Sequence, residues 1–219
     1  RVELVYAPAA RANFGSALGT REALYLQTLE NVTGRIYRAD LDAGTWRLTS
    51  VPMPSDGAIS LQDSDPARDE LFVNYQSFLV PPSLYLLPRP WAAPERLKSL
   101  PERFNAAGFE VVQREARSAD GTMIPYFLVR KRGLKEDGSA PTLLWAYGGF
   151  ERAYSPYYLE TQGKGWLEKG GSYVLATIRG GGEFGPAWHQ AALKTHRQRA
   201  FDDFIAVAEA LVARKTPSP

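Results

Sequence analysis

Alternating apolar and polar positions, interrupted at short intervals by turn residues, run through the first half of the chain. The apolar runs have the length of β-strands and lie at residues 24–29, 35–41, 45–51, 70–78 and 83–87. Asp42-Ala43-Gly44 separates two of these runs with the residue types of a hairpin turn. The pattern therefore predicts an antiparallel, all-β half, and its spacing fits either β-propeller blades or a sandwich.

The pattern changes near residue 105, after a stretch in which prolines repeat. Proline-rich segments are stiff and poor in helix, so they are common as connections between domains. We predict a domain boundary at this point. It divides the chain into an all-β domain of partial propeller blades, residues 1–104, and a second domain, residues 105–219.

The second domain begins with two expected strands, residues 109–117 and 122–131, around Asp120-Gly121. Asp-Gly supplies the positive φ angles that a tight hairpin needs. Two short apolar runs follow, at residues 142–147 and 172–178, and each is short enough to be a buried strand. The second domain is therefore expected to contain a sheet of at least these strands.

Helices are expected at residues 159–168 and again from residue 201 onwards. The later helix places its large apolar side chains on one side, which predicts its buried face: Phe201, Phe204, Ile205, Ala208, Leu211 and Val212. Asp202 and Asp203 lie in its first turn, where the helix dipole favours anions, and we interpret them as structural. A strand pair followed by strand, helix, strand and helix is how an α/β-hydrolase sheet begins, so we expect the first half of such a domain.

Charge and composition exclude several classes of partner. The 219 residues carry 26 basic and 24 acidic side chains, a net charge of +2, which gives no electrostatic reason to expect binding to nucleic acid or to an anionic membrane. No apolar run reaches the roughly 18 residues of a membrane-spanning helix. Cysteine is absent, which excludes disulfides and a cysteine nucleophile but leaves the compartment open between cytoplasm and bacterial periplasm.

Three segments carry a family resemblance. Residues 137–150, which end in Tyr147-Gly148-Gly149-Phe150, resemble the segment that opens the catalytic domain of prolyl oligopeptidases. Residues 178–189, with Arg179-Gly180-Gly181-Gly182-Glu183, and Phe201-Asp202-Asp203-Phe204 resemble two further segments of that family in the same order and spacing. The resemblance covers about residues 105–214, and the first half resembles the last propeller blades of such enzymes more loosely.

The resemblance implies a serine-type endopeptidase that cleaves short peptides after proline through an acyl-enzyme. In the family, the tyrosine that matches Tyr147 donates its hydroxyl to the oxyanion, and the phenylalanine that matches Phe150 forms one wall of the pocket for the proline ring. The resemblance implies no metal and no organic cofactor. The implied partner is an oligopeptide substrate, because the family's propeller restricts access to short peptides. The oligomeric state is left open.

A catalytic triad cannot be located in these residues. A serine hydrolase of this kind needs a Gly-x-Ser-x-Gly turn, then an aspartate and then a histidine. Residues 170–174 come nearest to the turn, but they end in valine and Ser172 enters an expected strand. His189 and His196 are the only histidines, and both precede the expected position of the serine. We therefore interpret both ends as cuts inside a longer polypeptide and predict that this chain alone is inactive.

Alternatives to these interpretations remain. The chain could be a non-catalytic hydrolase-like binding or remnant module, or part of a related esterase or aminopeptidase on the same scaffold. Tyr147 could be a core tyrosine and Phe150 a packing residue. The residues around the glycine run do not favour a nucleotide site, and His189, Glu183 and His196 lack the spacing of a metal site.

Overall fold

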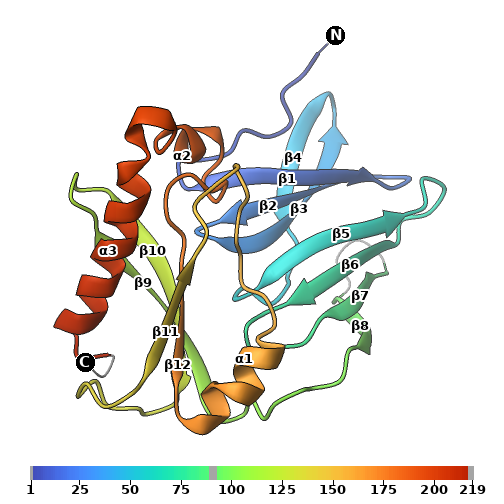
Figure 1. The fold of residues 1–219 in the computed structure, drawn as a ribbon. Coiled ribbons are helices and arrows are strands. Elements are labelled where there is room, and N and C mark those ends of the chain that lie inside the picture. Colours follow the sequence, from blue (N-terminus) through green and yellow to red (C-terminus); the bar gives the residue numbers. More distant parts are fainter. Residues whose placement is uncertain (1, 89–92, 217–219) are drawn as a thin grey trace. The chain divides into compact units, whose positions relative to one another are not determined.

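The computed structural model describes residues 2–88 and 93–216. The chain divides into two compact units, Arg1–Pro101 with Ser155–Tyr158, and Glu102–Tyr154 with Leu159–Pro219. Residues 155–158 belong to the first unit through contacts such as Tyr158 N–H to Gln76 Oε1, at 3.3 Å. The expected domain boundary at residue 105 stays a prediction. Figure 1 shows the elements in sequence colours.

The first unit contains two four-stranded antiparallel sheets. One has the order β1-β2-β3-β4, and the other has the order β5-β6-β7-β8. Their strands are β1 Ala12–Gly19, β2 Leu24–Glu30, β3 Thr33–Asp42, β4 Thr45–Ser50, β5 Ala58–Ser64, β6 Leu71–Gln76, β7 Ser83–Leu87 and β8 Glu95–Ser99. Each sheet is a meander of hairpins, as in a propeller blade, so the all-β prediction is confirmed.

The β3–β4 hairpin shows how local sequence builds these sheets. Asp42 pairs with Thr45, so the turn consists of Ala43 and Gly44 alone. Their φ angles are 47° and 82°, the positive values of a type I′ turn. The core of the first unit then joins both sheets through Tyr25, Ile36, Ile59, Leu71, Val73, Tyr75 and Leu87.

The strands β1, β5 and β8 were not expected from the sequence. Every residue of β8, Glu95–Ser99, is exposed, and its sequence Glu-Arg-Leu-Lys-Ser has no apolar alternation. All three strands lie at the edge of a sheet. An edge strand is held by backbone hydrogen bonds to one neighbour and buries little side-chain surface, so its sequence carries a weak hydrophobic pattern.

The second unit contains one mixed sheet of order β11-β12-β10-β9. Its strands are β9 Phe109–Arg117, β10 Met123–Lys131, β11 Thr142–Ala146 and β12 Ser172–Ala176. The predicted hairpin is confirmed, since β9 and β10 are antiparallel partners. The last strand in sequence, β12, pairs with β10 on one side and runs parallel to β11 on the other. This crossover agrees with the predicted start of an α/β-hydrolase sheet.

Short helices connect the strands, and a long one covers the sheet. The helix expected at residues 159–168 is divided into α1 Glu160–Gly165 and the 3₁₀ turn Leu167–Lys169. After β12 come α2 Pro186–Gln190, the 3₁₀ turn Lys194–His196 and α3 Gln198–Ala213, which lies against β9 and β10 (Figure 1). No helix among the described residues is long and apolar enough to cross a membrane.

The predicted buried face of α3 is wrong at half of its positions. Phe201, Ile205 and Val212 are exposed, whereas Leu211 is buried and Phe204 packs against the core, as predicted. The other buried positions are Ala200, Asp203, Ala206 and Val207. The helix carries apolar residues on two adjacent stripes, and periodicity alone does not say which stripe meets the sheet. The core that α3 joins contains Ile124, Tyr126 and Leu128 from β10 and Val174 and Ala176 from β12.

Candidate functional site

Tyr147 lies directly after β11, at the carboxyl end of the parallel β11/β12 pair. This is the edge at which α/β sheets place their ligands. Tyr147 is exposed, at 39%, and its ring lies 5.2 Å from the ring of Tyr154. The ring of Tyr154 in turn lies 4.7 Å from that of Trp145. The ring of Tyr147 is therefore in contact with a row of aromatic side chains, tilted against Tyr154, which in turn meets Trp145 edge to face.

The hydroxyl of Tyr147 forms no hydrogen bond within the described part of the chain. A tyrosine buried in a core usually finds a partner for its hydroxyl. A phenol that is supported through its ring and open at its O–H is available to donate a hydrogen bond to another molecule.

The residues after Tyr147 form a strained turn, and we call residues 147–154 the Tyr147 loop. Gly148 has a φ angle of 58°, and a Cβ atom there would lie 2.4 Å from Cγ1 of Ile178, so only glycine fits. Phe150 and Glu151 have φ angles of 52° and 54°. Bulky residues in this region store about 1–3 kcal/mol each and are commonest at functional sites.

Phe150 is the most exposed large aromatic side chain in the described residues, at 89%. It lies on the same turn as Tyr147, three residues later, but its side chain makes no packing contact with the core of the second unit. The sequence-predicted pair therefore lies on a single loop, and both side chains are exposed, Phe150 much more than Tyr147.

A second segment, residues 179–185, packs against the Tyr147 loop, and we call it the glycine loop. The backbone N–H of Glu151 lies 3.3 Å from the carbonyl oxygen of Gly180 and 3.0 Å from Nδ1 of His189. Nδ1 of His189 also lies 2.6 Å from the carbonyl oxygen of Gly180. His189 is thus occupied with the backbone of both loops. Groups of three or more side chains placed to hold a metal ion do not occur in the described ranges.

Glu183 is the buried acid of the glycine loop, with only 2% of the residue exposed. Its Oε1 accepts a hydrogen bond from the backbone N–H of Tyr154 at 2.9 Å, whereas Oε2 has no partner among the described residues. Burial raises the pKa of this carboxyl group to about 7, and the hydrogen bond from Tyr154 opposes that rise only in part.

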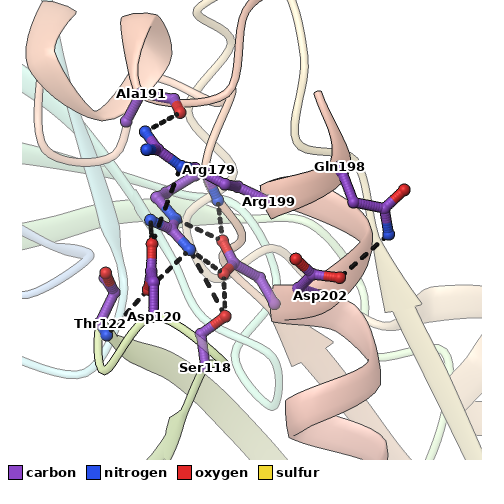
Figure 2. A network of polar contacts seen from close by, with 9 residues as sticks. Ser118, Asp120, Thr122, Arg179, Ala191, Gln198, Arg199 and Asp202 are labelled. Atoms are coloured by element: carbon purple, nitrogen blue, oxygen red, sulfur yellow. Dashed lines mark hydrogen bonds and ion pairs between the residues drawn. The ribbon is translucent and has the colours of Figure 1, made fainter. Parts of the chain in front are cut away.

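Arg179 anchors the start of the glycine loop in a buried polar network (Figure 2). Its backbone N–H and its Nε donate to Oδ2 of Asp203 at 3.0 Å and 2.9 Å, and its Nη2 donates to Oδ1 at 2.7 Å. It also pairs with Asp120, while the hydroxyl of Ser118 donates to Asp203 at 2.6 Å. Hydrogen bonds from Arg179 lower the pKa of Asp120 below its usual range. The network ties the β9–β10 turn, the glycine loop and α3 together.

Sequence reasoning weighed Glu183 only as part of a metal site, did not single out Arg197, and missed the role of Asp203. Arg197 donates from its guanidinium to the carbonyl oxygen of Gly148, next to Tyr147. Asp203 was interpreted as a residue of a helix end, but it is completely buried and pairs with Arg179. One signal was present in the sequence, namely an acid next to a glycine run after a buried strand. The burial of Asp203 could not be predicted, because the sequence does not say which stripe of α3 meets the sheet.

The comparisons with known proteins agree with the resemblance seen in the sequence. The family model of the prolyl oligopeptidase N-terminal beta-propeller domain matches residues 11–88, and that of the prolyl oligopeptidase family matches residues 159–219. An uncharacterized peptidase of Sinorhizobium fredii, y4nA, is 44% identical over the whole chain, which spans 30% of that protein. The prolyl endopeptidase of Elizabethkingia miricola is 34% identical over 74% of the chain and 23% of its own length.

Solved structures point the same way. A post-proline cleaving enzyme from Rickettsia typhi is 35% identical, with a TM-score of 0.86 over 99% of this chain and 31% of that one. Prolyl oligopeptidase B from Galerina marginata, bound to a 35mer hydrolysis and macrocyclization substrate, is 27% identical, with a TM-score of 0.89. The match covers 100% of this chain and 31% of that one. The chain spans about 30% of the length of the curated relatives that match all of it. Two models of the same family matched in chain order, relatives that match along the whole of this chain, and solved structures with the same fold show that the chain belongs to the prolyl oligopeptidase family.

Proposed function

We propose that the chain is part of a serine-type endopeptidase that cleaves short peptides after proline through an acyl-enzyme. The observation that carries the proposal is Tyr147, whose ring is supported by Tyr154 at the carboxyl end of β11 and whose hydroxyl has no partner among the described residues. A serine outside these residues attacks the carbonyl carbon of the scissile bond, and the resulting oxyanion accepts the Tyr147 hydroxyl. This donor acts on charge that develops only in the tetrahedral intermediate.

Phe150 supplies an apolar wall of the pocket for the proline ring in this proposal. Phe150 is 89% exposed and has a φ angle of 52°. Neither core packing nor the backbone preference of phenylalanine explains a phenylalanine at this position. A bound ring beside it would remove apolar surface from water, which favours proline over a polar residue at that position. The expected substrate is an oligopeptide. The related enzyme from Galerina marginata was solved with a 35mer peptide substrate.

The test of this proposal is Tyr147→Phe in the full-length protein. Loss of one oxyanion donor is expected to lower kcat by about 10²–10³ with little change in KM, because the ground-state carbonyl is less charged. The assay is release of a reporter amine after proline. Tyr85→Phe, which removes a hydroxyl from β7, is the matched control and should keep wild-type activity. Unchanged kcat in Tyr147→Phe would overturn the assignment of Tyr147.

The same assay separates the alternatives. Peptides blocked at the amino terminus exclude an aminopeptidase if they are cleaved, and a simple ester that is cleaved faster than every proline peptide would favour an esterase. A phosphonate probe that labels serine hydrolases tests for a binding or remnant module, which would not be labelled.

We also infer that residues 1–219 on their own do not hydrolyse peptides. They hold no Gly-x-Ser-x-Gly turn followed by the aspartate and histidine of a triad. The isolated segment and the full-length protein are compared in the proline assay at equal concentration. The full-length protein should release the reporter amine, and the segment should release none. Turnover by the pure segment would contradict this inference.

A further inference from the structure

The Tyr147 loop and the glycine loop contact each other mainly through their backbones. Besides the hydrogen bond from Glu151 to Gly180, a Cβ atom on Gly182 would lie 2.1 Å from the carbonyl oxygen of Glu151. The two loops therefore approach so closely that a side chain at Gly182 would separate them. One carboxyl group, that of Glu183, is enclosed where the glycine loop meets the end of the Tyr147 loop.

The surroundings of Glu183 contain no cation that pairs with it. The charged and titratable groups on the adjoining segments each have another contact in the described structure. Arg152 lies over the ring of Tyr154 at 4.9 Å, Arg179 pairs with Asp203, Arg197 donates to the carbonyl oxygen of Gly148, and Nδ1 of His189 contacts the carbonyl oxygen of Gly180. Glu151, the nearest other acid in the Tyr147 loop, is exposed.

Such an acid is costly to keep for stability alone. A carboxylate taken out of water without a cation loses far more solvation than one backbone N–H returns, so an apolar residue of similar shape would serve packing better. Glu183 nevertheless uses Oε1 to accept the N–H of Tyr154 at 2.9 Å. Among the described residues, that contact is the one polar link from its side chain to the Tyr147 loop.

The link leads directly to the catalytic candidate. The ring of Tyr154 lies 5.2 Å from the ring of Tyr147, tilted by 53°. We propose that Glu183 is a positioning residue, whose carboxyl group holds the backbone of Tyr154 so that its ring aims the Tyr147 hydroxyl at the oxyanion. The inference rests on the proposed function, because it assigns Glu183 a part in the same reaction.

The enclosed site favours the uncharged acid. Protonated Glu183 accepts the Tyr154 N–H without placing a charge between the loops, whereas ionised Glu183 adds a charge that no cation faces. Since burial raises the pKa of Glu183 to about 7, this change falls where the enzyme is assayed. Activity that depends on the uncharged acid is present below pH 7 and declines as pH rises through that value.

Two variants of the full-length protein test the proposal. Glu183→Gln keeps an uncharged acceptor at the same place, and Glu183→Met keeps the length without an acceptor. Glu183→Met is expected to lower kcat by about 10–100-fold with a smaller change in KM, whereas Glu183→Gln stays within about threefold of wild type at acidic pH. The ratio of Glu183→Gln to wild-type kcat/KM should rise across about pH 5 to 9. Glu209→Gln on the exposed side of α3 is the matched control and should show a flat ratio.

A double-mutant cycle with Tyr147→Phe distinguishes positioning from general support of the fold. If Glu183 acts through Tyr147, adding Glu183→Met to the Tyr147→Phe variant lowers kcat little further, because the hydroxyl is already absent. The effects of the two substitutions on kcat are then strongly non-additive. Additive effects, or a flat Glu183→Gln pH ratio, would overturn the inference even while Tyr147→Phe remained slow. Wild-type activity of Tyr147→Phe would instead overturn the proposed function. If Glu183→Met fails to fold, the Glu183→Gln ratio still decides.

Discussion

Single glycines govern how closely the two loops of the site approach. Gly180 has a φ angle of 98°, and a Cβ atom there would lie 2.5 Å from the carbonyl oxygen of Gly148. Gly170, at the end of the 3₁₀ turn before β12, has a similar φ angle of 95° with no atom near the Cβ position. Gly170 is required only by its backbone conformation, whereas Gly180 is required both by its backbone conformation and by the lack of space for a side chain.

Gly180→Ala is expected to destabilise the full-length protein by about 3 kcal/mol or more, because it combines a left-handed alanine with a backbone clash. Gly170→Ala should cost only about 1 kcal/mol, since the conformational term acts alone. Melting temperatures measured side by side check the difference. Equal losses would mean that the loops separate easily. In that case the close approach of Gly180 to Gly148 would not constrain the Tyr147 loop.

At the scale of elements, one buried arginine joins a hairpin, a loop and a helix. Arg179 follows β12, Asp120 lies in the β9–β10 turn, and Asp203 lies in α3. The Arg179 side chain is 5% exposed and that of Asp203 is 0% exposed, so water does not screen their pairing. Removing one partner of such a pair leaves the other charge buried and uncompensated, so the loss of either side chain strongly destabilises the fold.

Asp203→Ala is expected to destabilise the full-length protein by about 3–5 kcal/mol, because it leaves the Arg179 guanidinium buried with part of its hydrogen bonding lost. Its neighbour Asp202 is the control. Asp202 only accepts a hydrogen bond from Gln198 at 3.0 Å on the exposed side of α3, so Asp202→Ala should change stability by less than about 1 kcal/mol. Urea unfolding followed by tryptophan fluorescence measures both. A small effect of Asp203→Ala would show that the network is not needed to dock α3.

At the scale of the whole molecule, two carboxyl groups with opposite pKa shifts make stability depend on pH in opposite directions. The pKa of Asp120 is lowered by Arg179, so its contribution to the free energy of unfolding is present above its ordinary pKa and is lost as pH falls. The pKa of Glu183 is raised from 4.5 to about 7, so its contribution is present at acidic pH and is lost as pH rises towards 7. The summed contribution of these two groups to the free energy of unfolding is therefore greatest at mildly acidic pH.

Glu183→Gln is expected to stabilise the protein relative to wild type more and more as pH rises from about 5 to about 8, reaching on the order of 3 kcal/mol. Below about pH 4.5 the variant and the wild type should differ little, because both side chains are uncharged there. Melting curves at matched pH values give the difference, with Glu209→Gln as control. A constant difference across this range would show that Glu183 is already ionised in the fold or that water reaches it.

Local sequence determined several parts of this protein. Asp-Gly and Ala-Gly at the turns, and apolar runs of strand length, were sufficient to predict the β9–β10 hairpin, the β3–β4 hairpin and the strands β11 and β12. The expected burial is confirmed for β12 and wrong for β11, which is an edge strand without a buried residue. The three segments at residues 137–150, 178–189 and 201–204, in the same order and spacing as in the family, were together sufficient to predict the family. The hairpins and strands depend on the conformational preferences of neighbouring residues, which are present before any tertiary contact forms.

Only the tertiary structure decided the rest. β12 lies between β10 and β11, α3 buries the stripe with Asp203 and Val207, and Glu183 is enclosed against the backbone of Tyr154. Each outcome depends on residues far apart in the sequence, and the local pattern of each segment is compatible with more than one arrangement. Apolar residues on two stripes of α3, or an acid among glycines, acquire their environment only when the sheet and both loops are in place, because burial and ion pairing are properties of the packed chain.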